Sequence, residues 1–250
     1  YLTGPGGGGT MSVAETPEQA RRFVAYWAEE GASWIKFYTN ISREAMGAAI
    51  DEAHKQGMKA TGHLCSVTFR EAVDLHIDDL AHGGMTASDF IPGKQPDKCP
   101  PNSLVATDKG VSGDSPVATS LIAYMIEHGA SMTTTPAVYE LFYQNRPVQD
   151  PRVLDLMAPE VRTAYVAERT QIDTTTNWPL TAEGFTRSLA FDLAFQYRNP
   201  VVILGDGYLG QMTGKVCLPD RMVVPGIPEW AVYGDHSHRG NLICSIELSE

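Results

Sequence analysis

The sequence contains no run of eighteen apolar residues, the length that a helix needs to cross a bilayer, so we expect no membrane span. Positive charge is scarce too, because 19 Lys and Arg residues stand against 30 Asp and Glu residues, for a formal net charge of −11. Such a chain repels a phosphate backbone unless a local basic stripe compensates, and the sequence has no such stripe. We therefore expect neither a nucleic-acid partner nor a membrane partner.

Cysteine is also sparse, and the four cysteines are Cys65, Cys99, Cys217 and Cys244. They stand far apart, without the C-x-x-C spacing that is typical of zinc sites and iron–sulfur clusters, so we expect reduced, unpaired thiols. The chain opens at Tyr1 with no basic-then-apolar leader, which predicts a cytoplasmic location and a chain that begins inside a longer protein.

What remains is the composition of an ordinary globular protein, with 43% hydrophobic and 20% charged residues in a chain of 250. Short segments rich in apolar or β-branched residues predict strands at 34–38, 58–62, 77–81 and 131–135. Apolar residues at helical spacing predict helices between them, at 17–30, 43–55, 69–75 and 117–128, with a long loop over 83–116. Strands that alternate with helices join through crossovers, so we expect an α/β fold with a parallel sheet.

The second part of the chain departs from this pattern. Two helices are expected within 151–170, and the polar tract at 173–177 then marks a candidate boundary. A helix at 181–197 and an apolar strand at 200–204 follow, and the last forty residues are rich in Gly and Pro.

Three polar residues late in the predicted strands are the candidates for chemistry: Lys36, His63 and His82. Catalytic groups of parallel α/β sheets collect where strands end, and imidazoles at successive strand ends converge on one edge, where a cation can sit between them. The alternatives are that Lys36 extends its amine to the surface and that each His is an ordinary loop residue.

The strings Trp-Ile-Lys-Phe-Tyr (34–38), Ala-Thr-Gly-His-Leu (60–64) and Ile-Asp-Asp-Leu-Ala-His-Gly (77–83) occur in that order. In this, residues 1–173 resemble the metal-dependent amidohydrolases, in particular their imidazolonepropionase-like and prolidase-like branch. The resemblance implies part of a (β/α)8 barrel, about strands four to seven. It also implies that Lys36, as a carbamate, bridges two divalent ions such as Zn²⁺, and that His63 and His82 bind the second ion.

The chemistry that this resemblance implies is metal-assisted hydrolysis of an amide, cyclic amide or peptide C–N bond in a small-molecule or peptide substrate. The family pattern also includes an H-x-H pair after the first strand and an aspartate, the general base, after the eighth. Neither is found in place in this sequence.

Two further motifs are expected to lie in loops. His236-Ser237-His238 has H-x-H spacing but comes last in the chain, within a polar turn-like segment. Residues 205–210 read G-x-G-x-x-G after a predicted strand, but the Gly and Pro residues that follow make the helix of a dinucleotide site improbable.

The tail instead resembles the α-subunit of 2-oxoacid:ferredoxin oxidoreductases, over residues 177–250. The likeness is carried by residues 190–212, by Glu229-Trp230 and by the loop at 234–240. Those enzymes use thiamine diphosphate and iron–sulfur clusters, held largely by other subunits or domains. No cofactor or catalytic residue is assigned to this segment.

Two resemblances in one chain suggest a composite protein: an amidohydrolase part at 1–173, a linker at 174–180 and an oxidoreductase-like fragment at 181–250. The favoured function is metal-dependent hydrolysis, incomplete in this chain alone. One alternative is a subunit fragment that assembles with oxidoreductase partners or with a second copy of the chain, and another is an inactive composite.

Overall fold

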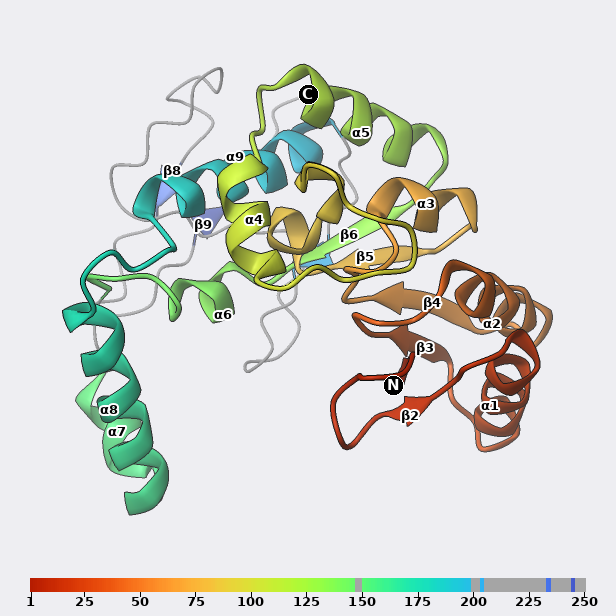
Figure 1. Ribbon diagram of the computed structural model, residues 1–250, viewed down its shortest axis with the longest axis horizontal. Coiled ribbons are helices and arrows are strands. Elements are labelled where there is room, and N and C mark those ends of the chain that lie inside the picture. Colours follow the sequence, from red (N-terminus) through yellow and green to blue (C-terminus); the bar gives the residue numbers. More distant parts are fainter. Residues whose placement is uncertain (147–149, 199–202, 205–232, 235–243, 246–250) are drawn as a thin grey trace.

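A computed structural model describes residues 1–146, 150–198, 203–204, 233–234 and 244–245 (Figure 1). Its main feature is a parallel sheet with the strand order β2-β1-β3-β4-β5-β6-β7. The strands are β1 (Leu2–Thr3), β2 (Ser12–Val13), β3 (Trp34–Phe37), β4 (Lys59–Gly62), β5 (Asp79–Ala81), β6 (Ser131–Thr134) and β7 (Ile203–Leu204). A separate antiparallel pair joins β8 (Tyr233–Gly234) and β9 (Cys244–Ser245). The predicted α/β class is confirmed, and the described strands form an open series from β2 to β7 without the closure of a barrel.

Helices connect the strands of the sheet. They are α1 (Pro17–Glu29), α2 (Arg43–Lys55), α3 (Phe69–Asp74), α4 (Ser103–Gly110), α5 (Pro116–Glu127), α6 (Pro136–Glu140), α7 (Pro151–Leu156), α8 (Pro159–Thr174) and α9 (Ala182–Arg198). The predicted helices are all present. The segment expected as a long loop differs, because it contains the 3₁₀ turns η1 (Gly83–Thr86) and η2 (Ser88–Phe90) as well as α4. Helix α4 begins after Asn102, whose side chain makes no capping bond although Asn is a residue type that favours this position.

The helices begin where the sequence provides caps. The hydroxyls of Thr16, Ser42 and Ser115 each accept a hydrogen bond from a backbone N–H in the first turn of α1, α2 and α5. Thr68 and Glu71 form a capping box at the start of α3, with each side chain bonding the backbone of the other residue. These caps fix the places where the chain leaves the sheet edge.

The two faces of the sheet differ in polarity. Along β3, Ile35 and Phe37 are buried in the main apolar core with the helices, while Lys36 between them is half-buried. In β6, Met132 is buried in that core and Thr133 is half-buried. Successive residues of a strand point to opposite faces, so one face packs against helices and the other carries polar side chains. The candidate site lies on the polar face.

The expectation of unpaired thiols is wrong for two of the cysteines. Cys65 and Cys99 form a disulfide, with Cα atoms 5.0 Å apart. Their separation of 34 residues gave no sign of this, because pairing depends on how the chain after β4 and the chain before α4 come together in space. Cys217 lies outside the described residues.

Residues on the two sides of the predicted boundary at 174–180 pack into the same apolar cores. Trp178 donates its indole N–H to the carbonyl oxygen of Phe142 at 2.8 Å, and Leu180 is buried. Beyond the boundary, Phe191 and Phe195 of α9 are fully buried in the main core, and β7 pairs with β6. The division into domains stays a prediction.

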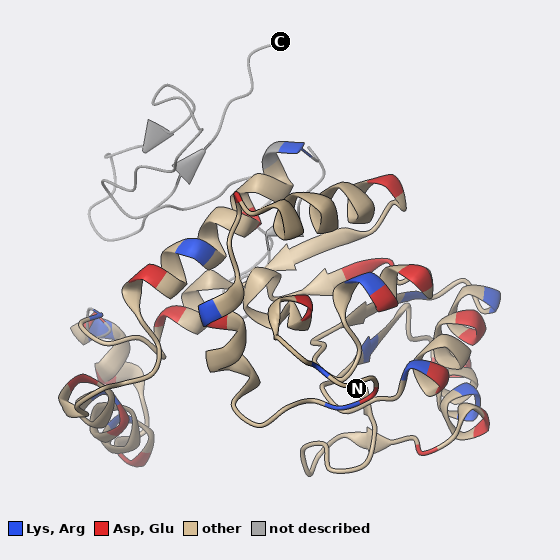
Figure 2. Cartoon of the chain, turned by 45° about the horizontal axis from the view of Figure 1, so that its top comes forward, with Lys and Arg blue, Asp and Glu red and all other residues tan. Residues whose placement is uncertain are grey.

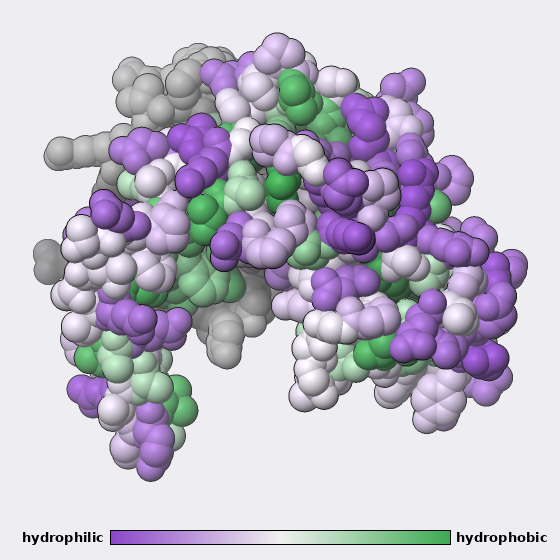
Figure 3. All heavy atoms as spheres, viewed as in Figure 1, coloured by the Kyte–Doolittle hydropathy of each residue, from purple (hydrophilic) through white to green (hydrophobic). Residues whose placement is uncertain are grey.

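Helices α7 and α8 form an arm that stands apart from the rest of the molecule. Helices α7 and α8 project away from the sheet (Figure 1), and a broad notch lies between this arm and the body (Figure 3). Charged residues lie mainly on the helices and the loops, with few on the strands (Figure 2). Within the described part of the chain, no helix has both the length and the apolar character that a membrane span requires.

Candidate functional site

The three predicted candidates come together at the carboxyl ends of adjacent parallel strands. Lys36 lies in β3, His63 directly follows β4 and His82 directly follows β5. The Lys36 Nζ atom is 3.4 Å from His82 Nε2, and the ring centroids of His63 and His82 are 4.6 Å apart. The structure therefore places one amine and two imidazoles within reach of a common point, whereas their role as ligands stays a prediction.

His82 is held by both its backbone and its ring. Its N–H donates to the carbonyl oxygen of Thr133 at 2.6 Å, and its Nδ1 is 2.8 Å from Thr135 Oγ1. The backbone is in the left-handed region, with φ 77°, which is uncommon for a residue with a side chain. With Nδ1 engaged by Thr135, Nε2 is the nitrogen that faces Lys36.

The turn after His82 is pinned by a distant helix. Gly83 has φ 68°, and the N–H of Gly84 donates to the Asp192 carboxylate in α9 at 2.7 Å. A Cβ atom on Gly83 would run into that carboxylate. Asp192 lies 108 positions beyond Gly84, so sequence reasoning gave no signal of this contact.

Burial keeps the two imidazoles of the site uncharged. It lowers the pKa of His63 to about 4, with help from the Lys36 charge. Burial, then His63, then Lys36 lower the pKa of His82 to about 3. Burial also lowers the pKa of Lys36, against the raising effect of Asp79. Both imidazoles are therefore neutral near pH 7, which is the state that binds metals.

Beneath the site runs a polar row that sequence reasoning missed. Lys36, Thr61, Asp79 and Ser131 stand in register across β3, β4, β5 and β6. The buried Asp79 carboxylate accepts hydrogen bonds from the hydroxyls of Thr61 at 2.6 Å, Thr133 at 2.9 Å and Ser131 at 3.2 Å. The sequence feature that could have indicated this row is the acidic residue Asp79 in a short, buried strand. This row gives Lys36 a negative neighbour on the polar face.

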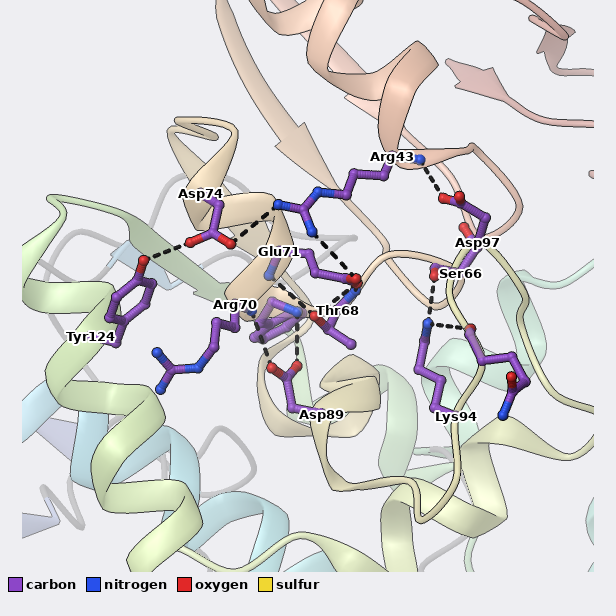
Figure 4. Close-up of polar contacts among 12 residues, drawn as sticks. Arg43, Ser66, Thr68, Arg70, Glu71, Asp74, Asp89, Lys94, Asp97 and Tyr124 are labelled. Carbon is purple, nitrogen blue, oxygen red and sulfur yellow. Dashed lines mark hydrogen bonds and ion pairs between the residues drawn. The ribbon is translucent and has the colours of Figure 1, made fainter.

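A second network holds the chain that follows His63 (Figure 4). Asp89 accepts hydrogen bonds from the N–H groups of Phe69 and Arg70 at 2.8 Å and 3.1 Å, at the start of α3. Lys94 donates to the carbonyl oxygen of Ser66 at 2.5 Å (Figure 4). Burial raises the pKa of Asp89, against the lowering effect of these N–H groups. The 83–98 region thus supports the turn that carries His63.

The site opens into a cavity of about 570 Å³. Lys36, His63 and His82 line one part of it, and Leu104, Tyr139 and Phe142 line another. Its size falls in the range of small-molecule pockets, roughly 300–1,000 Å³. Cys65 also lines it, so the disulfide borders the site.

The donor set fits a divalent cation in part. Two neutral imidazoles are good zinc ligands, and a hydrogen bond on the second nitrogen of His82 is the usual support of a metal-binding His. Among the described residues, no group of three or more His, Cys, Asp and Glu side chains has an arrangement that could hold a metal. A complete site would therefore need Lys36 and ligands beyond those described.

The two motifs expected to lie in loops, His236-Ser237-His238 and the G-x-G-x-x-G segment at 205–210, lie outside the described residues.

Comparison with known proteins gives two unrelated likenesses. No protein-family profile matches the chain. A segment of 61 residues is 48% identical to ketoisovalerate oxidoreductase subunit VorB of Methanothermobacter marburgensis and 46% identical to that of Methanothermobacter thermautotrophicus. The segment makes up 24% of this chain and 17% of either subunit, so the chain spans only a small part of these curated relatives.

Solved structures resemble the chain in fold. Bottromycin amidohydrolase superposes with a TM-score of 0.53 at 16% identity, covering 82% of this chain and 44% of that protein. Ochratoxinase of A. niger superposes with a TM-score of 0.43 at 15% identity, covering 82% of this chain and 39% of that protein. The chain thus shares the fold of somewhat less than half of bottromycin amidohydrolase.

Proposed function

We propose that this chain is part of a metal-dependent hydrolase of amide, cyclic amide or peptide C–N bonds. The observation that carries the proposal is the meeting of Lys36, His63 and His82 at adjacent strand ends inside one cavity. The fold shared with part of bottromycin amidohydrolase supports it. The one-sided polarity of the sheet supports the finer idea that the chain supplies about strands four to seven of a (β/α)8 barrel, with the polar face inside.

His63 and His82 would hold a divalent cation such as Zn²⁺ through ring nitrogens, with Thr135 fixing the ring of His82. The chemistry supplied by a bound cation is Lewis acidity, which lowers the pKa of water to about 7 and polarises a carbonyl. The low pKa values of both imidazoles keep their lone pairs free for this purpose.

Lys36 would act as a carbamate. Its neutral amine attacks carbon dioxide: a C–N bond forms, one C=O π bond breaks with its electron pair moving onto that oxygen, and the nitrogen releases one proton to solvent. Burial favours the neutral amine that this step needs. The product carries two oxygen ligands in place of one ammonium, and it suits two cations better than the lysine itself does.

Metal analysis of the purified full chain after loading with zinc tests the proposal. We expect roughly stoichiometric zinc, and at least a tenfold weaker affinity in His63→Ala and in His82→Ala. His128→Ala is the matched control, because the ring of His128 bonds the carbonyl oxygen of Tyr124 away from the cavity. A wild-type chain that takes up no zinc, or equal binding in all the variants, would overturn the proposal.

A K36A variant tests the carbamate separately. We expect K36A to hold less zinc than the wild type, and added bicarbonate with a short-chain carboxylic acid to restore the wild-type content. Unchanged zinc content in K36A would remove Lys36 from the site while leaving the two histidines in place.

The VorB segment supports a second candidate function, a fragment of a thiamine-dependent 2-oxoacid:ferredoxin oxidoreductase joined to the hydrolase part. Under this candidate the purified chain holds no zinc and binds the other subunits of such an enzyme when mixed with them. Zinc bound through His63 and His82 with no subunit binding would favour the hydrolase and leave the tail without a role of its own.

A further inference from the structure

We propose that the apolar wall of the cavity beside His82 binds an uncharged apolar group of aromatic size, next to the bond that is cleaved. The wall is formed by Leu104 in α4 and by Val138, Tyr139 and Phe142 in and after α6. This inference rests on the proposed hydrolase function and specifies its substrate class.

The wall belongs to a second apolar core and is well supported. Leu104 and Phe142 are half-buried and pack against a buried cluster that includes Met85, Tyr139 and Phe185. Apolar residues also show at the surface around α6 and α9 (Figure 3). A wall that is half-exposed and backed by buried apolar side chains gains free energy when an apolar group covers it, at about 25 cal/mol per Å².

Charge in the cavity points the same way. Among its described lining residues there is no Asp, Glu or Arg, and Lys36 is the one side chain of a charged type. An acidic or basic substrate group placed against Leu104 and Phe142 would lose its hydration without gaining a counter-ion. The wall therefore selects against charge as well as for apolar area.

Tyr139 joins the wall to the reacting centre. Its ring centroid is 6.0 Å from that of His82 and 6.0 Å from that of Phe142. The Tyr139 ring thus lies between His82 and the rest of the wall, and a group bound on the wall is close to the candidate ligands.

Binding of three matched amides to the full chain tests the inference. N-acetylphenylalaninamide, N-acetylaspartamide and N-acetyllysinamide differ only in the side chain, and their dissociation constants can be measured by NMR titration with zinc and again with chelator. We expect the phenylalanine amide to bind at least tenfold more tightly than either charged amide. Equal binding of the three amides would overturn the inference.

Variants locate the binding on this wall. Leu104→Ala and Phe142→Ala should each weaken binding of the phenylalanine amide about five- to tenfold, which matches the apolar area removed. Leu156→Ala is the control, because it makes the same truncation at a leucine that is 88% exposed in α7. If Phe142→Ala does not fold, Leu104→Lys replaces it and should shift preference towards the aspartate amide. An unchanged preference in a folded Leu104→Lys would place the binding elsewhere and overturn the inference.

The inference and the proposed function fail separately. A chain that binds zinc through His63 and His82 but shows no preference among the amides remains a hydrolase candidate with a different substrate. A chain that prefers the phenylalanine amide at Leu104 but binds no zinc keeps the apolar wall and loses the hydrolytic function.

Discussion

At the scale of single residues, the site depends on groups that set orientation and charge around His82. Its left-handed backbone, with φ 77°, and the bond between its Nδ1 and Thr135 direct Nε2 towards Lys36. Neither feature supplies a ligand atom to a cation. Both restrict the positions that the imidazole can take, and this is how outer partners raise the affinity of a metal site.

A Thr135→Val variant tests this orientation. Loss of the 2.8 Å bond frees the imidazole to change tautomer and rotate, so we expect zinc affinity to fall about tenfold to a hundredfold. Competition with a zinc indicator measures the change. Thr163→Val is the matched control, since Thr163 bonds the carbonyl oxygen of Pro159 within α8. Equal affinities in the two variants would show that Thr135 does not position the ring.

Asp192 predicts a pH dependence of stability. Burial raises the pKa of its carboxyl to about 7, against the lowering effect of the Gly84 N–H. The folded chain therefore holds this proton more tightly than the unfolded chain does, and Asp192 lowers stability progressively as pH rises from about 4 to about 7. Below about pH 3 both states are protonated and the effect is absent.

An Asp192→Asn variant removes that dependence, because its amide oxygen can still accept from Gly84 while carrying no charge. We expect it to be more stable than the wild type by about 4 kcal/mol at pH 8, and about equal at pH 3. Urea unfolding at the two pH values measures this difference. A variant destabilised by the same amount at both values would contradict the titration and indicate a purely structural role.

At the scale of elements, the predictable parts are those with local causes. The strand that carries Lys36 and the helix starts at Thr16 and Ser42 follow from periodicity and caps within a few residues. Contacts between segments distant in the sequence could not be predicted from local patterns. The 3₁₀ turn after His82 is fixed by Asp192, and the start of α3 is bonded by Asp89 from 20 residues away.

The turn between β5 and η1 yields a prediction for Gly83→Ala. Gly83 has φ 68°, and an added Cβ would meet the Asp192 carboxylate, so strain and collision act together. We expect a loss of about 3 kcal/mol in unfolding free energy and weaker zinc binding through His82. Gly93→Ala is the matched control, because Gly93 has φ 69° but no atom within 4 Å of the added carbon. It should lose only about 1 kcal/mol and keep its zinc affinity.

At the scale of the whole molecule, the chain shares the fold of part of bottromycin amidohydrolase over most of its length and matches VorB over 61 residues. The sequence alone suggested two units that meet at 174–180. In the structure α9 follows that junction and buries Phe191 and Phe195 in the core built by the preceding strands and helices. The packing thus ties the two parts together whatever the origin of each.

Truncation after residue 180 tests that dependence. The shortened chain would expose the core surfaces that Phe191 and Phe195 cover and would leave β6 without its neighbour β7. We expect its thermal unfolding to be non-cooperative. In the full chain, Phe195→Ala should cost about 3–5 kcal/mol by denaturant unfolding, while Leu156→Ala on the arm should change stability by less than about 0.5 kcal/mol. If residues 1–180 unfold cooperatively at the temperature of the full chain, the boundary at 174–180 separates independent folding units, and the shared core contributes little to stability.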